Sequence, residues 1–353
     1  MGARLNQFPR ARRVLLDAVA ARAFPAAVIE VGDATRIRWR EPFGRLTYDA
    51  QAAPATDDTI FDLASLTKVI ATTPLLMQQV ERGAIGLDDP VSTHIAEWQG
   101  EDRAPVTIRD LLAHSSGLPG GWVQLFREYA GADAFRTAIC RIPLEYAPGT
   151  TSVYSDLGFI LLGLLLDAPV PLPVRFVTML SQMSVAEEIQ FNPPSLWLPR
   201  TAPTAFDPWR GRQLVGEVDD ENTCALGGAA GHAGLFGTVK AVGGYARHLL
   251  QILDGRTGVV RRDTLETFIR RDARVPDSSR ALGWDTMLPT SSCGTRMSPR
   301  AFGHTGFTGT SLWIDPEAGI YVALLTNRVH PTRENNAIQA VRPAVHDAVM
   351  AEL

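Results

Sequence analysis

The stretch Phe61-Asp62-Leu63-Ala64-Ser65-Leu66-Thr67-Lys68 places a lysine three residues after a serine. Residues at i and i+3 lie on one face of a helix, so the Lys68 amine can reach the Ser65 hydroxyl. Of the 34 basic residues, only Lys68 and Lys240 are lysines. Arginine keeps its proton near neutral pH, whereas a desolvated lysine can lose it. The stretch therefore predicts a serine nucleophile whose proton acceptor is Lys68, held neutral by burial and its neighbours.

The surroundings of Ser65 support a catalytic role. The segment Thr59 to Leu63 is strand-like, and a long helix is predicted to run from Ser65 to about Gly83. The hydroxyl would then lie at the positive end of a helix dipole, which favours alkoxide and oxyanion character. The simpler interpretation of Ser65 is a helix N-cap, and both roles can coexist.

A second motif, Tyr154-Ser155-Asp156, follows a turn at 147–150 and precedes another predicted helix. A phenol next to an ammonium can have a lowered pKa and can pass a proton to a leaving group. The simpler interpretation of Tyr154 is an aromatic side chain packed in the core.

A third motif, His304-Thr305-Gly306, is followed by Phe307 and a predicted strand. Glycines at 303, 306 and 309 keep side chains away from the backbone, so a substrate could lie along the strand edge. The Phe307 N–H, paired with that of Ser65, would form an oxyanion hole worth about 3–4 kcal/mol per donor. The simpler interpretation of His304 is a hydrogen-bonded residue at a sheet edge.

Taken in this order, the three motifs resemble those of the penicillin-recognising serine hydrolases. This family includes class C β-lactamases, low-molecular-weight penicillin-binding proteins (D,D-peptidases), and related serine esterases and amidases. The resemblance extends from Phe61 to about Val345 and is strengthened by Val106–Leu118 and Gly231–Thr238. It implies a β-lactamase/transpeptidase-like α/β (α+β) fold, in which a five-stranded antiparallel sheet is flanked by helices.

An inserted all-helical lobe completes the implied architecture. Residues 1–63 and 230–353 would form the sheet lobe and residues 64–229 the helical lobe, with the active site in the cleft between them. The resemblance assigns Ser65 as nucleophile and Lys68 and Tyr154 to proton transfer. It assigns oxyanion and substrate binding to five further residues: Asp156, His304, Thr305, Gly306 and Phe307.

Two residues depart from the family pattern. His304 stands where most members carry lysine, which weakens a fixed positive charge for a substrate carboxylate. Asp156 stands where asparagine is commoner, so an amide donor to the substrate's acyl side chain is missing. Both departures argue against efficient β-lactam turnover. Both are typical of the esterase-like and muropeptide-processing members of the family.

The segment Val215–Asn222, leading into Gly227–His232, resembles a subgroup of D,D-carboxypeptidases and N-acetylmuramyl-L-alanine amidases, which usually has histidine where this chain has Asp219. The acidic loop, Asp219 to Glu221, could gather with His232 to bind a cation or an amine-bearing substrate. The plainer interpretation, which we favour, is a structural loop whose carboxylates cap helices. Its spacing matches no metal-ligand set, so neither a metal nor a cofactor is predicted.

Composition limits the partners and the compartment. A net charge of −4 over 353 residues gives no reason to expect nucleic acid or an anionic membrane as a partner. The pattern over Arg4 to Arg22 predicts an amphipathic helix, and the N-terminus shows no secretory signal. The longest apolar run, Phe159 to Leu166, is too short to span a bilayer. A cytoplasmic protein is predicted, or a periplasmic one if an export signal has been removed.

The sequence thus predicts a serine hydrolase that attacks an amide or ester bond through a Ser65 acyl-enzyme. The preferred substrate is a small molecule, a peptidoglycan fragment, cleaved as by a D,D-carboxypeptidase or an N-acetylmuramyl-L-alanine amidase. One alternative is a promiscuous carboxylesterase or β-lactamase using the same residues. Another, from a different functional class, is a non-catalytic muropeptide or β-lactam sensor that is acylated and then stalls.

Overall fold

The computed structural model describes residues 8–183, 185 and 188–353. Its largest sheet has six antiparallel strands within these residues, in the order β2-β1-β11-β10-β9-β8. The strands are β1 (Ala26–Asp33), β2 (Ile37–Gly44), β8 (Asp285–Thr286), β9 (Phe302–Thr305), β10 (Ser311–Asp315) and β11 (Ile320–Thr326). The prediction of five strands is wrong by one, because the two-residue β8 pairs with β9 and extends the edge of the sheet.

Both ends of the chain build this sheet. β1 pairs with β2 on one side and with β11 on the other, so that Val28 lies opposite Leu325. Every residue of β11, and all of β1 except Asp33, is buried. Such continuous burial is expected of strands whose two faces are both covered.

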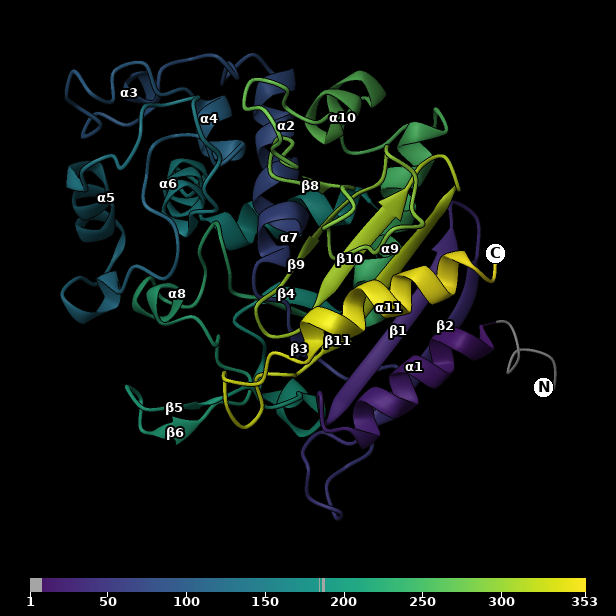
Figure 1. Ribbon diagram of the computed structural model, residues 1–353. Helices are drawn as coiled ribbons and strands as arrows, with labels where there is room; N and C mark the ends of the chain where they lie inside the picture. The colour runs from purple at the N-terminus through teal and green to yellow at the C-terminus, as the bar shows by residue number, and fades with distance from the viewer. Residues whose placement is uncertain (1–7, 184, 186–187) are drawn as a thin grey trace.

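Helices cover the two faces of the sheet (Figure 1). α1 (Pro9–Ala20) and α11 (Ile338–Met350) pack against each other on one face, and α9 (Val239–Leu253) packs against β1 and β11 on the other. α1 begins later than the helix predicted over Arg4 to Arg22, and residues 4–7 of that prediction lie outside the described residues. Thr238 caps α9 by accepting the Ala241 N–H, as expected of a threonine at this position.

The regular structure between β3 and β7 is mostly helical, and much of it lies to the left of the sheet in Figure 1. Its helices are η1 (Lys68–Thr72), α2 (Thr73–Glu81), α3 (Val91–His94), α4 (Ile108–Leu112), η2 (Leu125–Arg127), α5 (Ala132–Arg141), α6 (Asp156–Leu166), α7 (Leu172–Gln182), η3 (Ser195–Arg200) and α8 (Glu221–Ala225). α10 (Arg262–Ile269) follows α9. The division into lobes at residues 63/64 and 229/230 stays a prediction.

Two small sheets complete the fold. β3 (Phe61–Asp62), β7 (Leu235–Gly237) and β4 (Ile189–Phe191) form one, and β5 (Phe206–Asp207) and β6 (Arg212–Gln213) form the other. β3 ends at Asp62, three positions before Ser65, so the pairing of β3 with β7 fixes the position of the backbone that leads into Ser65. Within the described residues, no helix combines the length and apolar character that a membrane span requires.

Candidate active site

Ser65 follows a tightly constrained turn. Ala64 has a positive φ of 46°, which is uncommon for a residue with a side chain. The Asp62 carboxylate accepts the Ala64 N–H at 2.8 Å, and Leu63 N–H donates to Leu235 O at 2.9 Å. Strained backbone held in this way by its surroundings is often found at functional sites.

Lys68 is completely buried and lies at the centre of a hydrogen-bond network. Its Nζ is 3.0 Å from Ser65 Oγ, 2.7 Å from Tyr154 Oη and 2.6 Å from Asp156 Oδ1. Tyr154 Oη is also 2.9 Å from Ser65 Oγ. The backbone at Lys68–Thr72 forms a π-helical turn, a feature frequent at functional sites. The first two sequence motifs therefore meet at the hydroxyl of Ser65.

The protonation state of Lys68 differs from the prediction. Burial by itself lowers the pKa of Lys68, but the Asp156 carboxylate and the Tyr154 hydroxyl outweigh it and raise this pKa above its ordinary value. The free site therefore holds an ammonium, and the prediction of an amine kept neutral is wrong for this state. The sequence argument placed Asp156 toward the substrate and did not anticipate its pairing with Lys68.

The pKa expected for Tyr154 is also corrected. Burial raises the pKa of the Tyr154 phenol above its ordinary value, and the nearby Lys68 ammonium does not offset this effect. Tyr154 therefore enters the reaction as a neutral hydroxyl. Such a group is suited to passing a proton between an ammonium and a leaving group.

His304, on β9, lies beside these groups. Its ring centroid is 5.8 Å from that of Tyr154, and Nδ1 is 2.8 Å from Thr305 O. Burial, followed by the charges of Lys68 and Arg280, holds the pKa of His304 well below its ordinary value. His304 is therefore neutral and provides no fixed positive charge, in agreement with the sequence argument.

The loop after β9 is tied to the segment before Ser65. Thr308 Oγ1 donates to Asp62 O at 2.7 Å, and Thr310 Oγ1 donates to Leu63 O at 3.0 Å. Gly306 allows this approach, because a Cβ there would lie 2.6 Å from Leu63 O. The third motif is thereby fixed next to the first.

Two backbone donors remain free at this junction. Among the hydrogen bonds of the described residues, neither Ser65 N–H nor Phe307 N–H donates to a protein acceptor. Both residues line the cavity in front of the Ser65 hydroxyl. An oxyanion hole built from these two groups stays a prediction, and their unpaired state supports it.

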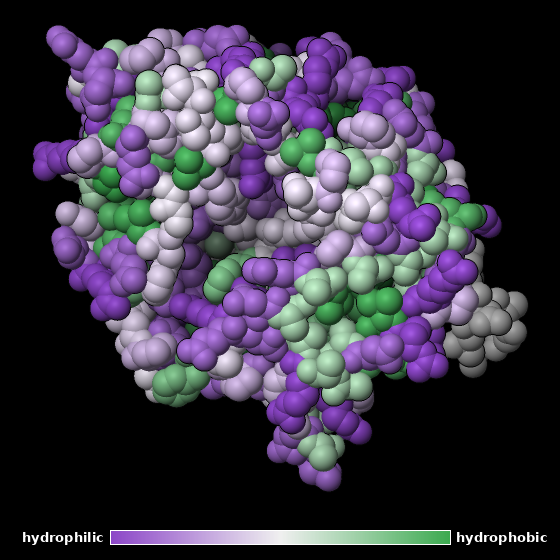
Figure 2. Space-filling model, in the orientation of Figure 1, coloured by the Kyte–Doolittle hydropathy of each residue, from purple (hydrophilic) through white to green (hydrophobic). Residues whose placement is uncertain are grey.

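Two cavities meet at Ser65, Tyr154 and Phe307, and Figure 2 shows a hollow in this face of the molecule. The first, of about 490 Å³, is the acidic cavity; its other charged or aromatic lining residues are Asp62, Trp122, Asp156, Asp219, Asp220, Glu221, His232 and Arg333. The second, of about 330 Å³, is the arginine cavity; its other charged or aromatic lining residues are Arg280, Asp285, His304, Arg328 and Arg342. Ser65 thus lies between a cavity lined by several carboxylates and one lined by three arginines.

Two arginines of the arginine cavity donate hydrogen bonds to backbone oxygens, whereas the third lies over an aromatic ring. Arg342 donates to Gly306 O at 2.7 Å and to Thr310 O at 2.9 Å, and Arg328 donates to Phe307 O at 2.8 Å. The Arg280 guanidinium lies 5.2 Å from the centroid of the Tyr154 ring. Among the ion pairs of the described residues, none involves these three arginines. An anionic group could therefore bind here without displacing a carboxylate of the protein.

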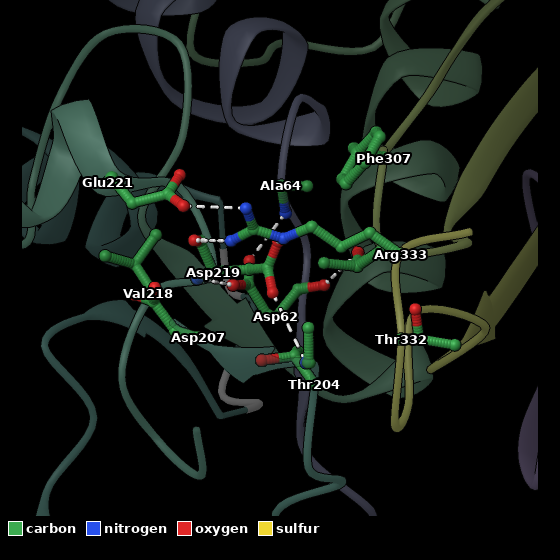
Figure 3. Close-up of polar contacts among 12 residues, drawn as sticks. Asp62, Ala64, Thr204, Asp207, Val218, Asp219, Glu221, Phe307, Thr332 and Arg333 are labelled. Atoms are coloured by element: carbon green, nitrogen blue, oxygen red, sulfur yellow. Dashed lines mark hydrogen bonds and ion pairs between the residues drawn. The ribbon is translucent and has the colours of Figure 1, made fainter. Parts of the chain in front are cut away.

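The carboxylates of the acidic loop have partners within the chain. Figure 3 shows Arg333 between Asp219 and Glu221, with Nε 3.0 Å from Asp219 Oδ2 and Nη1 2.7 Å from Glu221 Oε1. Asp220 accepts the Thr223 N–H at 2.6 Å and pairs with His232 Nε2 at 2.8 Å. The helix-capping interpretation holds for Asp220, whereas Asp219 and Glu221 bind Arg333. Within the described residues, no group of three or more His, Cys, Asp and Glu is arranged to hold a metal ion.

Four arginines of the site were not predicted from the sequence: Arg280, Arg328, Arg333 and Arg342. No local motif marks them, because 32 of the 34 basic residues in this chain are arginine. Only the fold shows that these four line the cavities beside Ser65.

Comparison with known proteins fixes the family. The model of the family described as Beta-lactamase matches residues 11–346. The chain belongs to the beta-lactamase family. It is a serine hydrolase of the β-lactamase fold, and the resemblance noted from the three motifs is confirmed.

The most similar curated relatives carry a peptidase name. A protein of Escherichia coli O157:H7 named "Putative D-alanyl-D-alanine carboxypeptidase" is 30% identical, over 93% of this chain and 83% of its own. A protein of the same name from Salmonella agona is 31% identical, over 78% of this chain and 71% of its own.

Solved structures share the fold at low sequence identity. A penicillin-binding protein homologue from Caulobacter crescentus has a TM-score of 0.76 at 20% identity, covering 100% of this chain and 99% of that one. A hydrolase with promiscuous acyltransferase activity also reaches 0.76 at 20% identity, covering 96% and 98%. Simvastatin synthase from Aspergillus terreus reaches 0.75 at 20% identity, covering 98% of both chains. At these identities the likeness shows the fold alone.

Proposed function

We propose that this hydrolase is a carboxypeptidase that removes the C-terminal residue, of the D-alanine kind, from peptides of peptidoglycan fragments. The observation that carries the proposal is the arginine cavity, which opens beside Ser65 and whose arginines make no ion pair within the described residues. The residue released by a carboxypeptidase carries a free carboxylate. Guanidinium groups are well suited to bind a carboxylate, because they present paired donors and keep their charge.

Arg280 compensates for the missing lysine of the third motif. The neutral His304 leaves the edge of β9 without a fixed charge, and Arg280 supplies one from the segment that precedes β8. The relatives named as D-alanyl-D-alanine carboxypeptidases support the same substrate class. The edge of β9, with Thr305 and Gly306, would hold the peptide backbone.

Acylation then follows from the distances around Ser65. Once Lys68 has released one proton to solvent water, its lone pair takes the Ser65 proton across 3.0 Å while Oγ attacks the carbonyl carbon. The resulting oxyanion accepts hydrogen bonds from the Ser65 and Phe307 N–H groups. Tyr154 gives its proton to the departing amine and regains one from Lys68 across 2.7 Å. The C–N bond breaks and the Ser65 ester remains.

In deacylation the protons pass between the same groups in the opposite order. A water molecule in the position of the departed amine gives a proton toward Tyr154 and Lys68 and attacks the ester carbonyl. Ser65 Oγ leaves and regains a proton from Lys68. The proton transfers among Ser65, Lys68 and Tyr154 span hydrogen bonds that the free site already contains.

The test compares three substrates with the purified protein: an acylated peptide ending in D-Ala-D-Ala, the same peptide with a C-terminal carboxamide, and a short p-nitrophenyl ester. The free carboxylate should raise kcat/KM over the carboxamide about 100-fold, which corresponds to about 3 kcal/mol for a buried charge pair. Released D-alanine is measured directly.

Other results would identify the alternatives. Equal rates for the carboxylate and carboxamide peptides would contradict the proposal, and turnover of the ester alone would indicate a carboxylesterase. Rapid opening of a chromogenic β-lactam would indicate a β-lactamase. Release of an L-alanine peptide from a muropeptide would indicate an amidase, and a lasting Ser65 adduct without turnover would indicate a sensor.

A further inference from the structure

The Asp156 carboxylate occupies a place in the site that the reaction proposed above does not use. Asp156 begins α6, and its Oδ1 lies 2.6 Å from Lys68 Nζ. The side chain of Lys68 is fully buried, whereas that of Asp156 keeps 26% of its exposure, toward the acidic cavity. This aspartate is the second-motif residue where related sequences commonly have asparagine, which has nearly the same shape and no charge.

Four oxygen atoms surround the Lys68 amine. They belong to Ser65, Tyr154, Asp156 and the backbone of His232, which accepts at 3.4 Å. An ammonium has three hydrogens to donate to such a ring of acceptors, whereas a neutral amine has two hydrogens and a lone pair. The contact with Asp156 is the shortest of the four, and it is the one with a charged partner.

The other titratable groups near Lys68 do not replace this carboxylate. His114 and His304 are both held neutral by burial, which lowers the pKa of each well below its ordinary value. The Arg280 guanidinium stacks on the Tyr154 ring and adds positive charge. Among the salt bridges of the described residues, the only one that Lys68 makes is with Asp156.

We propose that Asp156 is a positioning residue that decides when Lys68 can act as a base, because it holds the third proton on the amine of the free enzyme. The proposal rests on the role proposed above for Lys68. Ser65 is then activated only in those molecules from which this proton has departed. Ser65 reactivity should therefore rise with pH into the alkaline range. The raised pKa of Lys68 is consistent with this assignment.

Replacing Asp156 by asparagine removes the carboxylate charge with little change of shape, so it isolates the effect of this charge on the protonation of Lys68. In Asp156→Asn the amine keeps a polar neighbour but loses its counter-ion, so only Tyr154 still opposes the effect of burial, and the balance shifts toward the neutral amine. Each unit by which the Lys68 pKa falls raises the neutral fraction tenfold at any pH below both values. At pH 7 the variant should therefore acylate at least about 10-fold faster than the native protein.

The experiment measures how fast a neutral p-nitrophenyl phosphonate diester labels Ser65 between pH 6 and pH 10, by intact mass. Ser65 Oγ forms a bond to phosphorus, p-nitrophenolate leaves, and the Ser65 proton goes to Lys68, so no peptide substrate is needed. In Asp156→Asn the rise in labelling rate should move to lower pH. Asp156→Ala should move it in the same direction, which separates the charge from any amide contact.

Asp88→Asn is the control, because it removes an exposed carboxylate, paired with Arg109, that lines neither cavity. Its labelling profile should follow that of the native protein. Thermal unfolding of each variant shows that the comparison is between folded proteins. Identical pH profiles for the native protein and a folded Asp156 variant would overturn the proposal while leaving Ser65 as the nucleophile. A native protein that is labelled at no pH would instead overturn the proposed mechanism itself.

Discussion

The Arg280 guanidinium lies over the ring of Tyr154, 5.2 Å from its centroid, and both residues line the arginine cavity. A substrate carboxylate bound to Arg280 would therefore also position the scissile bond relative to Tyr154. In the proposed reaction, this contact would couple carboxylate binding to proton transfer.

Replacing Arg280 should weaken the preference for a free carboxylate. In Arg280→Gln, the ratio of kcat/KM for the carboxylate peptide to that for its carboxamide should fall about 10-fold or more, because a charged hydrogen-bond donor has been lost. Steady-state kinetics on both peptides measures this ratio. Arg262→Gln, which changes an arginine on α10 paired with Glu266, should leave the ratio intact. An unchanged ratio in Arg280→Gln would place the carboxylate elsewhere.

The two residues of the first motif should each be essential. Ser65→Ala should abolish acylation while the protein stays folded, because it removes the nucleophile alone. Lys68→Arg should be nearly as damaging although it retains the charge, since a guanidinium does not give up its proton near neutral pH. Intact mass after phosphonate treatment, together with hydrolysis rates, measures both effects.

The other lysine of the chain supplies the control. Lys240 lies on α9, and its partner Asp58 is largely exposed. Lys240→Arg should therefore retain the native rate. If Lys68→Arg also keeps most of its activity, Lys68 is not the base.

Removing the Tyr154 hydroxyl should affect substrates unequally. Tyr154→Phe loses the group that bridges Lys68 and Ser65, and general acid catalysis of this kind is worth about 10²–10⁴-fold. The loss should be largest for a peptide, whose amine must be protonated as it leaves, and smaller for a p-nitrophenyl ester, whose phenolate leaves unaided. The ratio of the two rates measures the effect.

Tyr146→Phe is the matched control, because the Tyr146 hydroxyl donates to His114 O at 3.2 Å and lines neither cavity. It should change neither rate. An equal loss on both substrates in Tyr154→Phe would indicate that Tyr154 supports the site without transferring a proton to the leaving group.

Each of the three motifs could be recognised in the sequence because it is local, whereas their convergence was implied by the resemblance to the serine hydrolase family. Ser65 and Lys68 are one helical turn apart, and the glycines around Phe307 mark a backbone that another segment can approach closely. These features depend on spacing and on residue type, both of which can be seen without a fold.

The charge environment could not be predicted in the same way. Asp156 lies 88 positions from Lys68 in the sequence, and Arg333 lies more than 100 positions from its partners Asp219 and Glu221. Whether a carboxylate faces the substrate or a buried amine is decided by the packing of α6 against η1. The raised pKa of Lys68 follows from that contact, which no local pattern in the sequence indicates.

Arg333 should carry a large part of the stability of the acidic loop. Arg333→Met would leave the nearly buried carboxylates of Asp219 and Glu221 without their cation, and breaking such a pair costs about 3–5 kcal/mol. Burial already raises the pKa of both carboxyls, with Arg333 acting in the opposite direction. Without Arg333 both pKa values rise further, and the folded state then binds more protons than the unfolded state.

The destabilisation of Arg333→Met should consequently be greatest near pH 7.5 and should shrink as the pH falls toward 5, because protonation relieves the unpaired charge. Urea unfolding at the two pH values measures this change. Arg212→Met breaks the exposed pair with Glu217 and should cost less than about 1 kcal/mol at either pH. A loss in Arg333→Met that is as small as that of Arg212→Met would show that the acidic loop does not depend on Arg333. A large loss that is equal at both pH values would show that packing of the Arg333 side chain, rather than its charge, holds the loop in place.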